Sequence, residues 1–247
     1  MKAFCAAVAY VADDDPARRH HGEAAVRLVF LGPPGAGKGT QAARCAVAWR
    51  VVHISTGDLF RAEATRATTL GQQLASYMQR GVLVPDALVV ELVSQRLGAD
   101  DAQAGFILDG FPRTVAQATA VDATLATRQQ PIELAVHFAT SAAVMLRRLS
   151  GRRICRSCGA NYHVETLRPS VAGHCDHCQG ALYQRADDQP ETILKRLDIY
   201  RAESEDLLLH YRQRGLLRDV NGDLELEAMQ RRLAQLVTEE HLLPVVR

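Results

Sequence analysis

The hydrophobic positions of the chain fall into short apolar runs separated by longer amphipathic segments. From residue 26 onward the apolar runs predict buried strands, and the segments between them have the spacing of helices that bury one face. Strands are expected at Val26–Leu31, Val51–Ile54, Phe106–Leu108, Ile132–Phe138 and Leu216–Val220. Helices are expected to begin at Lys38, Asp58, Leu70, Asp86, Thr114, Ala142, Pro190 and Leu224. This alternation predicts a doubly wound α/β fold around a five-stranded parallel sheet.

Two segments lie outside this alternation. Residues 1–25 carry a short apolar stretch, which a signal peptide would also have, but three aspartates follow it at once and its basic start is a single lysine. We therefore expect a disordered N-terminal extension, or a start codon placed too early, ahead of a domain that covers residues 26–247. The second segment, residues 152–188, holds four of the six cysteines and predicts a small inserted subdomain.

Composition and charge narrow the classes of partner. The hydrophobic fraction is 47%, which excludes a disordered or fibrous chain. The chain has 29 Lys and Arg against 28 Asp and Glu, so no bulk field draws it to nucleic acid or to an anionic membrane. No apolar run approaches the roughly 20 residues that span a bilayer. Because the net charge is near zero, any phosphate ligand must be held by local positive charge.

A glycine-rich segment follows the first predicted strand directly and reads Gly32-Pro33-Pro34-Gly35-Ala36-Gly37-Lys38-Gly39-Thr40. Glycines let the backbone curl so that successive N–H groups point at phosphate oxygens, and Lys38 adds a mobile positive charge. The helix expected after the loop directs the positive end of its dipole at the same anion. The order of strand, loop and helix predicts a phosphate-binding loop. Its one departure from the usual pattern is Gly39, which stands between the lysine and Thr40.

The cysteines of the insert form two Cys-x-x-Cys pairs. Cys155 and Cys158 are separated by sixteen residues from Cys175 and Cys178. This pairing is typical of a structural zinc site in which four thiolates fill a tetrahedral shell. Two disulfides or free thiols, iron in place of zinc, and a histidine ligand from position 174 or 177 are the alternatives. Because so small a segment has little apolar surface, metal binding is expected to supply its folding energy.

The glycine-rich loop has the form found in adenylate kinases, and further motifs resemble that family in the same order. Residues 54–61, Ile-Ser-Thr-Gly-Asp-Leu-Phe-Arg, are similar to its nucleoside-monophosphate segment. Residues 109–114, Asp-Gly-Phe-Pro-Arg-Thr, resemble the signature that holds the AMP phosphate. The resemblance covers nearly all of residues 26–240 and points to the long bacterial form. It implies the P-loop nucleoside monophosphate kinase fold, with an AMP-binding insert at 55–84 and a zinc-binding lid at 151–188.

The resemblance also implies roles for individual residues. It places ATP against Gly35, Ala36, Gly37, Lys38, Gly39, Thr40, Arg148, Arg152, Asn161, Tyr162 and Leu224. It places AMP against Thr56, Arg61, Val82, Leu83, Val84, Gly110, Phe111, Pro112, Arg113, Gln117, Arg185 and Arg196. The reaction implied is reversible phosphoryl transfer from MgATP to AMP, giving two ADP, in a monomeric cytoplasmic enzyme.

Physical reasoning supports the same basic residues. Transfer between ATP and AMP brings two strongly anionic substrates together, so cationic clamps are required, and guanidinium groups hold phosphate oxygens bidentately. The residues that supply this charge are Lys38, Arg61, Arg113, Arg148, Arg152, Arg185 and Arg196. Among them the resemblance implies Lys38, Arg113, Arg152, Arg185 and Arg196 as the catalytic candidates, with no catalytic base. Asp109 ends a predicted strand beside the phosphate loop, where a carboxylate orients Mg²⁺ through its water ligands.

Competing functions remain open at this level. The acceptor could be UMP or CMP, or the donor GTP, although the resemblance favours AMP through Thr56 and Gln117. A zinc ribbon on nucleic acid with the phosphate loop as a motor is opposed by the near-zero net charge. A noncatalytic nucleotide-binding regulator is opposed by the complete set of basic residues.

Overall fold

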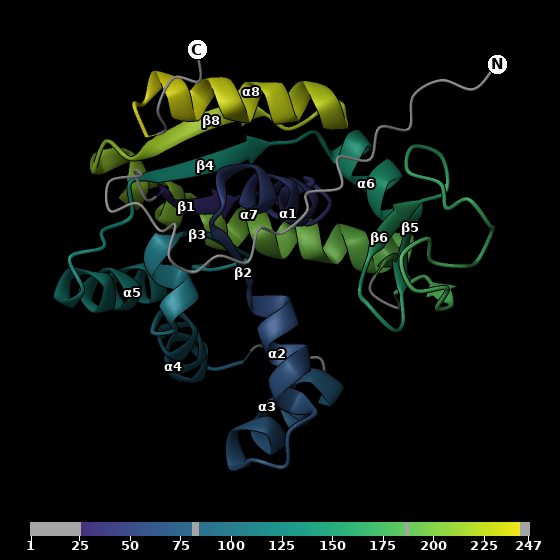
Figure 1. The fold of residues 1–247 in the computed structure, drawn as a ribbon, viewed down its shortest axis with the longest axis horizontal. Coiled ribbons are helices and arrows are strands. Elements are labelled where there is room, and N and C mark those ends of the chain that lie inside the picture. The colour runs from purple at the N-terminus through teal and green to yellow at the C-terminus, as the bar shows by residue number, and fades with distance from the viewer. Residues whose placement is uncertain (1–25, 81–83, 186–187, 243–247) are drawn as a thin grey trace, which may run out of the picture.

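The computed structural model describes residues 26–80, 84–185 and 188–242. Its centre is a five-stranded sheet in the order β2-β3-β1-β4-β8, and every pairing in it is parallel. The strands are β1 (Val26–Leu31), β2 (Val52–Ser55), β3 (Gly105–Asp109), β4 (Leu134–Ala139) and β8 (Leu217–Asn221). The predicted fold class is confirmed, with strand ends shifted by one or two residues (Figure 1). The predicted extension, residues 1–25, lies outside the described residues.

Helices cover both faces of the sheet because its side chains alternate between two apolar cores. Val26, Leu28 and Phe30 of β1 join one core, whereas Val29 and Leu31 join the other. The first core is closed by α1 (Lys38–Trp49) and α8 (Leu226–Glu239), and the second by α4 (Asp86–Leu97), α5 (Val115–Thr127) and α7 (Pro190–Gln213). Such continuous apolar strands are typical of parallel sheets buried on both sides.

Two helices project from the core as a separate lobe, α2 (Thr56–Ala64) and α3 (Thr69–Arg80) (Figure 1). The first begins two residues before the predicted start at Asp58. The reason is local: the Ser55 hydroxyl accepts a hydrogen bond from the Asp58 backbone N–H at 3.3 Å and caps the helix. The Asp58 carboxylate therefore lies in the first turn, where the helix dipole favours a negative charge.

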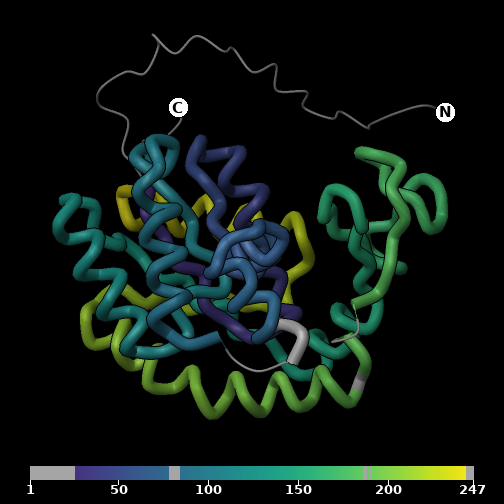
Figure 2. The backbone as a smooth tube through the Cα atoms, turned by 90° about the horizontal axis from the view of Figure 1, so that it is seen from below, coloured from purple at the N-terminus to yellow at the C-terminus, as the bar shows by residue number. Residues whose placement is uncertain are grey.

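The cysteine-rich insert forms a second lobe, reached through α6 (Ala142–Ser150). Its antiparallel strands β5 (Arg152–Cys155), β6 (Asn161–His163) and β7 (Leu182–Tyr183) pair in the order β6-β5-β7. Figure 2 shows this lobe standing apart from both the core and the α2–α3 lobe. The short helix Asp100–Ala104 and the three lid strands were not predicted. No helix in the described part of the chain is long and apolar enough to cross a membrane.

Candidate functional site

The phosphate-binding loop connects β1 to α1 as predicted. Gly35 and Gly37 have φ values of 81° and 90°, a backbone conformation that residues with a side chain rarely adopt. Lys38 is the first residue of α1, and its Nζ donates hydrogen bonds to the carbonyl oxygens of Gly32 at 2.7 Å and Pro33 at 2.9 Å. The ammonium group is thereby held over the loop, where a phosphate group would meet both the lysine and the helix N-terminus.

The glycine at position 39 is explained by Asp109, the last residue of β3, which lies beside it. A Cβ atom built at Gly39 would lie 3.0 Å from Oδ2 of Asp109, so a side chain would push against the carboxylate. The same oxygen lies 3.3 Å from Nε2 of His53 on β2. The departure from the usual loop pattern thus leaves room for Asp109. His53 was missed by the sequence reasoning, because nothing in its local sequence indicates which carboxylate lies beside it.

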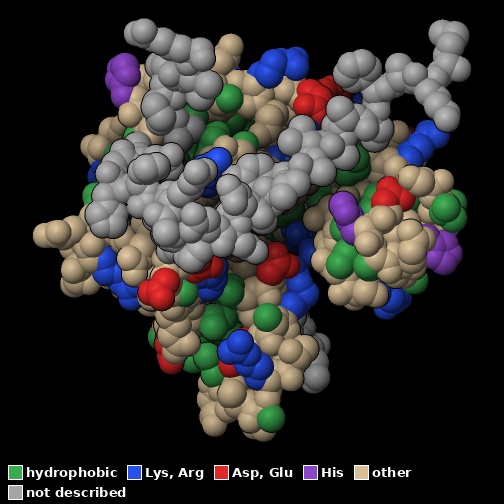
Figure 3. All heavy atoms as spheres, in the orientation of Figure 1, with side chains coloured by type: hydrophobic (Ala, Val, Ile, Leu, Met, Phe, Trp, Pro, Cys, Tyr) green, Lys and Arg blue, Asp and Glu red, His purple; other side chains and the backbone are tan. Residues whose placement is uncertain are grey.

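Basic side chains from distant segments converge on Lys38. Burial, with smaller contributions from the charges of Arg113, Arg196 and Arg152, lowers the pKa of Lys38 to about 8 against the opposing effect of Asp109. Burial and Arg196 also lower the pKa of Arg113. The Arg113 side chain is nevertheless exposed to solvent. Basic side chains are visible between the core and the lid lobe in Figure 3.

The depressed pKa of Lys38 predicts a pH-dependent stability. Between pH 8 and 10.5 the unfolded chain binds a proton at this lysine that the folded chain does not, so folding becomes more favourable as pH rises. Below pH 8 the buried charge costs at most about 3 kcal/mol. We expect the wild type to gain stability relative to Lys38→Met across this window, measured by urea unfolding at several pH values. A difference that stays constant with pH would contradict the burial of the charged amine.

A buried carboxylate links the lid to the core. Asp188 has no exposed surface and accepts two hydrogen bonds from Arg152, at 2.8 and 2.5 Å, and a longer one from Arg196 at 3.5 Å. Arg152 begins β5 of the lid and Arg196 lies on α7, so Asp188 holds guanidinium groups from both parts. Asp188 is the last residue of the lid expected from the sequence, which assigned it no role. Arg185 precedes it as a half-buried residue at the same end of the lid.

The residues expected on the ATP side meet around Arg148. Its guanidinium donates to the backbone carbonyl oxygens of Gly222 at 2.7 Å, Leu224 at 2.8 Å and Ala36 at 3.3 Å. These contacts bring the phosphate loop, α6 and the turn after β8 together. Asn161 and Tyr162 lie instead in the lid lobe on β6.

The residues expected on the AMP side meet at the end of β3. The Gly110 carbonyl accepts hydrogen bonds from the Thr56 hydroxyl at 3.1 Å and from Nε of Arg113 at 3.0 Å. Phe111 and Pro112 are buried beside it. Arg61 forms an ion pair with Asp58 on its own helix. Val84 is half-buried and packs against the second core, while Val82 and Leu83 lie outside the described residues.

Gln117 belongs to a closed hydrogen-bond network. Its Oε1 accepts from the Arg113 backbone N–H at 2.7 Å, and its Nε2 donates to Oδ1 of Asp86 at 2.7 Å. The Thr114 hydroxyl donates to the other oxygen of Asp86 at 2.8 Å and accepts from the Gln117 backbone N–H at 3.1 Å. Both polar groups of the amide thus have a partner inside the protein, and Gln117 is only 5% exposed.

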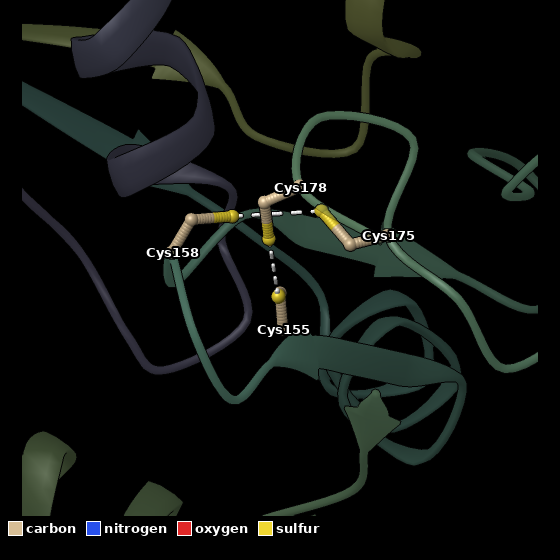
Figure 4. A group of neighbouring side chains, drawn as sticks. All are labelled: Cys155, Cys158, Cys175 and Cys178. Carbon is tan, nitrogen blue, oxygen red and sulfur yellow. Dashed lines mark hydrogen bonds between the residues drawn. The ribbon is translucent and has the colours of Figure 1, made fainter. Parts of the chain in front are cut away.

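The four lid cysteines form the one metal-binding group found among the described residues. All four Sγ atoms lie within 4.8 Å of one another, with 3.4 Å between Cys155 and Cys178 and 3.5 Å between Cys158 and Cys175 (Figure 4). Disulfide sulfurs would be about 2.05 Å apart, so the disulfide alternative is wrong for this structure. Four thiolates bound to zinc at about 2.3 Å would be spaced only slightly wider than the closest pairs. The donor set fits a tetrahedral metal ion.

Tyr162 supports this cluster from inside the lid. It is 6% exposed, its hydroxyl lies 3.4 Å from Sγ of Cys175, and it accepts a hydrogen bond from the Asp176 backbone N–H at 2.7 Å. Desolvation opposes ionisation of Cys175, but hydrogen bonds from Tyr162 and from backbone N–H groups lower its pKa to about 6. A thiolate is the form that binds metal.

Comparison with known proteins finds one family to which most of the chain is similar. The family model described as "Adenylate kinase" matches residues 30–216. A Geobacillus sp. (strain WCH70) protein named "Adenylate kinase" is 47% identical over 202 residues, which cover 82% of this chain and 94% of the relative. Proteins of the same name from Thermodesulfovibrio yellowstonii and Moorella thermoacetica are 49% and 48% identical, over 80% and 83% of this chain and 92% and 94% of theirs.

Proposed function

Because the chain belongs to the adenylate kinase family, we propose that its cleft transfers the γ-phosphoryl group of MgATP to the phosphate of AMP, giving two ADP. The observation that carries the proposal is the convergence of Arg113, Arg152 and Arg196 on Lys38 beside Asp109. Asp109 and Asp188 offset only part of the positive charge of these four side chains, so the cluster favours further negative charge. Two nucleotide phosphate chains supply that charge.

The phosphate loop and the Arg148 region are the proposed ATP side. Backbone N–H groups of residues 35–40 and Nζ of Lys38 hold the β- and γ-phosphates, while Arg148 and the turn at Leu224 border the nucleoside. Asn161 and Tyr162 approach from the lid. Mg²⁺ would be held through Asp109 and the Thr40 hydroxyl, and when bound it neutralises charge on the phosphates of ATP.

The end of β3 and the α2–α3 lobe are the proposed AMP side. Arg61 and Arg113 hold the AMP phosphate, with Arg152, Arg185 and Arg196 at the transferred group. Gly110, Phe111 and Pro112 support Arg113, while Thr56 and Gln117 border the base, with Val84 along its face. Transfer then depends on alignment and charge rather than on a protein base.

The acceptor preference tests this function directly. We would give purified protein MgATP with AMP, CMP, UMP or GMP in parallel and measure the ADP formed. A clear preference for AMP is expected. Preference for another monophosphate would keep the mechanism and change the substrate, whereas tight nucleotide binding without turnover would identify a regulator.

Arg113→Ala is expected to change the KM values for AMP and for MgATP to different extents. Its loss is expected to raise the KM for AMP about 100-fold, because a charge-assisted phosphate contact is worth roughly 2–3 kcal/mol. The KM for MgATP should change much less. Steady-state kinetics with each substrate varied in turn provide the measurement, and Arg232→Ala on the exposed face of α8 is the control. Equal changes in both KM values would contradict the assignment of Arg113 to AMP.

The lid cysteines are proposed to hold a structural zinc ion rather than a catalytic one. A complete four-thiolate shell has no open position for catalysis, and the cluster lies in the lid lobe rather than in the phosphate cleft. We also propose a monomer, as the sequence resemblance implies, which sedimentation analysis tests. The cytoplasmic location expected from the sequence stays a prediction.

A further inference from the structure

We infer that Asp86 fixes the amide of Gln117 in the one orientation that pairs with a 6-aminopurine and rejects a 6-oxopurine. The inference deepens the proposed function and rests on it, because it takes Gln117 to border the base of the acceptor nucleotide. Asp86 lies in the first turn of α4, and it acts on the base only through Gln117. It is therefore a positioning residue for acceptor specificity.

The orientation of the amide follows from its two partners. A carboxylate only accepts hydrogen bonds, so the Asp86 oxygen 2.7 Å away must face the NH₂ group of Gln117. A backbone N–H only donates, so Arg113 must face the carbonyl oxygen. Rotating the amide by half a turn would set an oxygen against the carboxylate and two donors against each other. Both contacts would become repulsive together.

Asp86 is itself held in place. Its second oxygen accepts from the Thr114 hydroxyl at 2.8 Å, and that hydroxyl accepts from the Gln117 backbone N–H at 3.1 Å. The carboxylate is thus anchored to the same first turn of α5 that carries Gln117. A reversed amide cannot be accommodated by a small rotation of Asp86, because both of its oxygens are engaged.

The fixed amide matches one base edge. Within this network the amide of Gln117 keeps two unused hydrogen-bonding sites, which are a lone pair on Oε1 and a proton on Nε2. Adenine offers the complement, since its N6 amino group donates and its N1 accepts. Hypoxanthine and guanine offer the reverse, because O6 accepts and N1–H donates. A 6-oxopurine therefore needs the amide orientation that Asp86 opposes, and a site with wrongly paired buried groups rejects a substrate strongly.

Asp86→Asn tests the inference because asparagine is nearly isosteric and can present either an oxygen or an NH₂ group to Gln117. The ratio of kcat/KM for AMP to that for IMP is expected to fall about tenfold or more, with the change in KM rather than kcat. IMP is the probe because it lacks the 2-amino group of GMP. The matched control is Asp101→Asn, which removes an exposed carboxylate paired with Arg96.

A double-mutant cycle with Gln117→Ala decides whether Asp86 acts through the amide. Asp86→Asn in the Gln117→Ala background should leave the AMP to IMP ratio unchanged, since nothing remains to be oriented. If Gln117→Ala collapses the ratio but Asp86→Asn alone does not, the inference is overturned and the proposed function stands. If Gln117→Ala leaves the ratio as in the wild type, the base is read elsewhere and the inference fails. Absence of AMP turnover in the wild type would overturn the proposed function itself.

Discussion

Lys38→Met is expected to lower kcat for ADP formation by about 10²–10³-fold while the KM for AMP changes little. The substitution keeps the length of the side chain and removes the only ammonium group that the structure places over the phosphate loop. Charge on the transferred group is largest in the transition state, so losing a preorganised cation there reduces the rate more than it reduces binding. Steady-state kinetics with saturating MgATP measure the effect.

The control for Lys38 is the same substitution on the surface. Lys195 lies exposed on α7, and Lys195→Met should leave kcat within about twofold of the wild type, as for most surface changes. Circular dichroism at pH 7 should show that Lys38→Met is folded, since removing a buried charge does not destabilise the core. A folded Lys38→Met variant with near-normal kcat would contradict a role of the phosphate loop in catalysis.

Much of the fold could be predicted because local rules and tertiary packing agree there. The central strands β1 and β3 have apolar side chains on both faces, so each reads as a short apolar run. Pro190 begins α7 and Thr114 caps α5, as their local sequence indicates. The strand boundaries shifted because register with a neighbouring strand, which is not local, sets where each strand begins.

The lid strands could not be predicted for a physical reason. They are two to four residues long, too short for a hydrophobic period to be recognised. Their positions are set instead by the knuckles of Cys155 and Cys175, which are 20 residues apart in the chain. The spacing of the cysteines indicated a metal site, but not the sheet that it organises.

The individual residues of the candidate site could be predicted from the sequence, but the contacts between their side chains could not. Motifs located Lys38 and Arg113, because the residue types and their spacing carry the chemistry. The side chains that orient them come from other segments: Asp188 binds Arg152 from across the lid, and Asp86 binds Gln117 from 31 positions away. A single sequence does not record which polar side chain meets which, so these contacts needed the structure.

Removal of the metal is the second change for which a large effect is expected, and it should unfold the lid without unfolding the core. The apolar cluster of the lid is built on Cys155, Tyr162 and Cys175, and two of these belong to the four-cysteine group. So little apolar surface cannot offset the entropy of ordering the segment, so its folding energy must come from the metal. The five-stranded core has its own two clusters and does not depend on the lid.

Cys178→Ser tests this in the whole protein. Elemental analysis should find one zinc per wild-type chain and little in the variant, and would reveal iron if that is the metal. Limited proteolysis should cut the variant between residues 155 and 182, while the main thermal transition moves by only a few degrees. Because Arg152 begins the first lid strand, kcat should fall about 10–100-fold, the usual cost of disturbing a metal-supported site.

Cys45→Ala is the control that distinguishes an effect on the lid from an effect on the core. Burial in α1 raises the pKa of Cys45 to about 12, so this thiol stays protonated and is unsuited to metal binding. Its replacement should lower core stability by about 1 kcal/mol and leave the metal content unchanged. If Cys178→Ser kept full metal content, or if its lid resisted protease as well as the wild type does, the cysteines would not be what folds the lid. In that case β5, β6 and β7 would have to be stabilised by contacts with the core, and the ion pair of Arg152 with Asp188 would be the first of those to test.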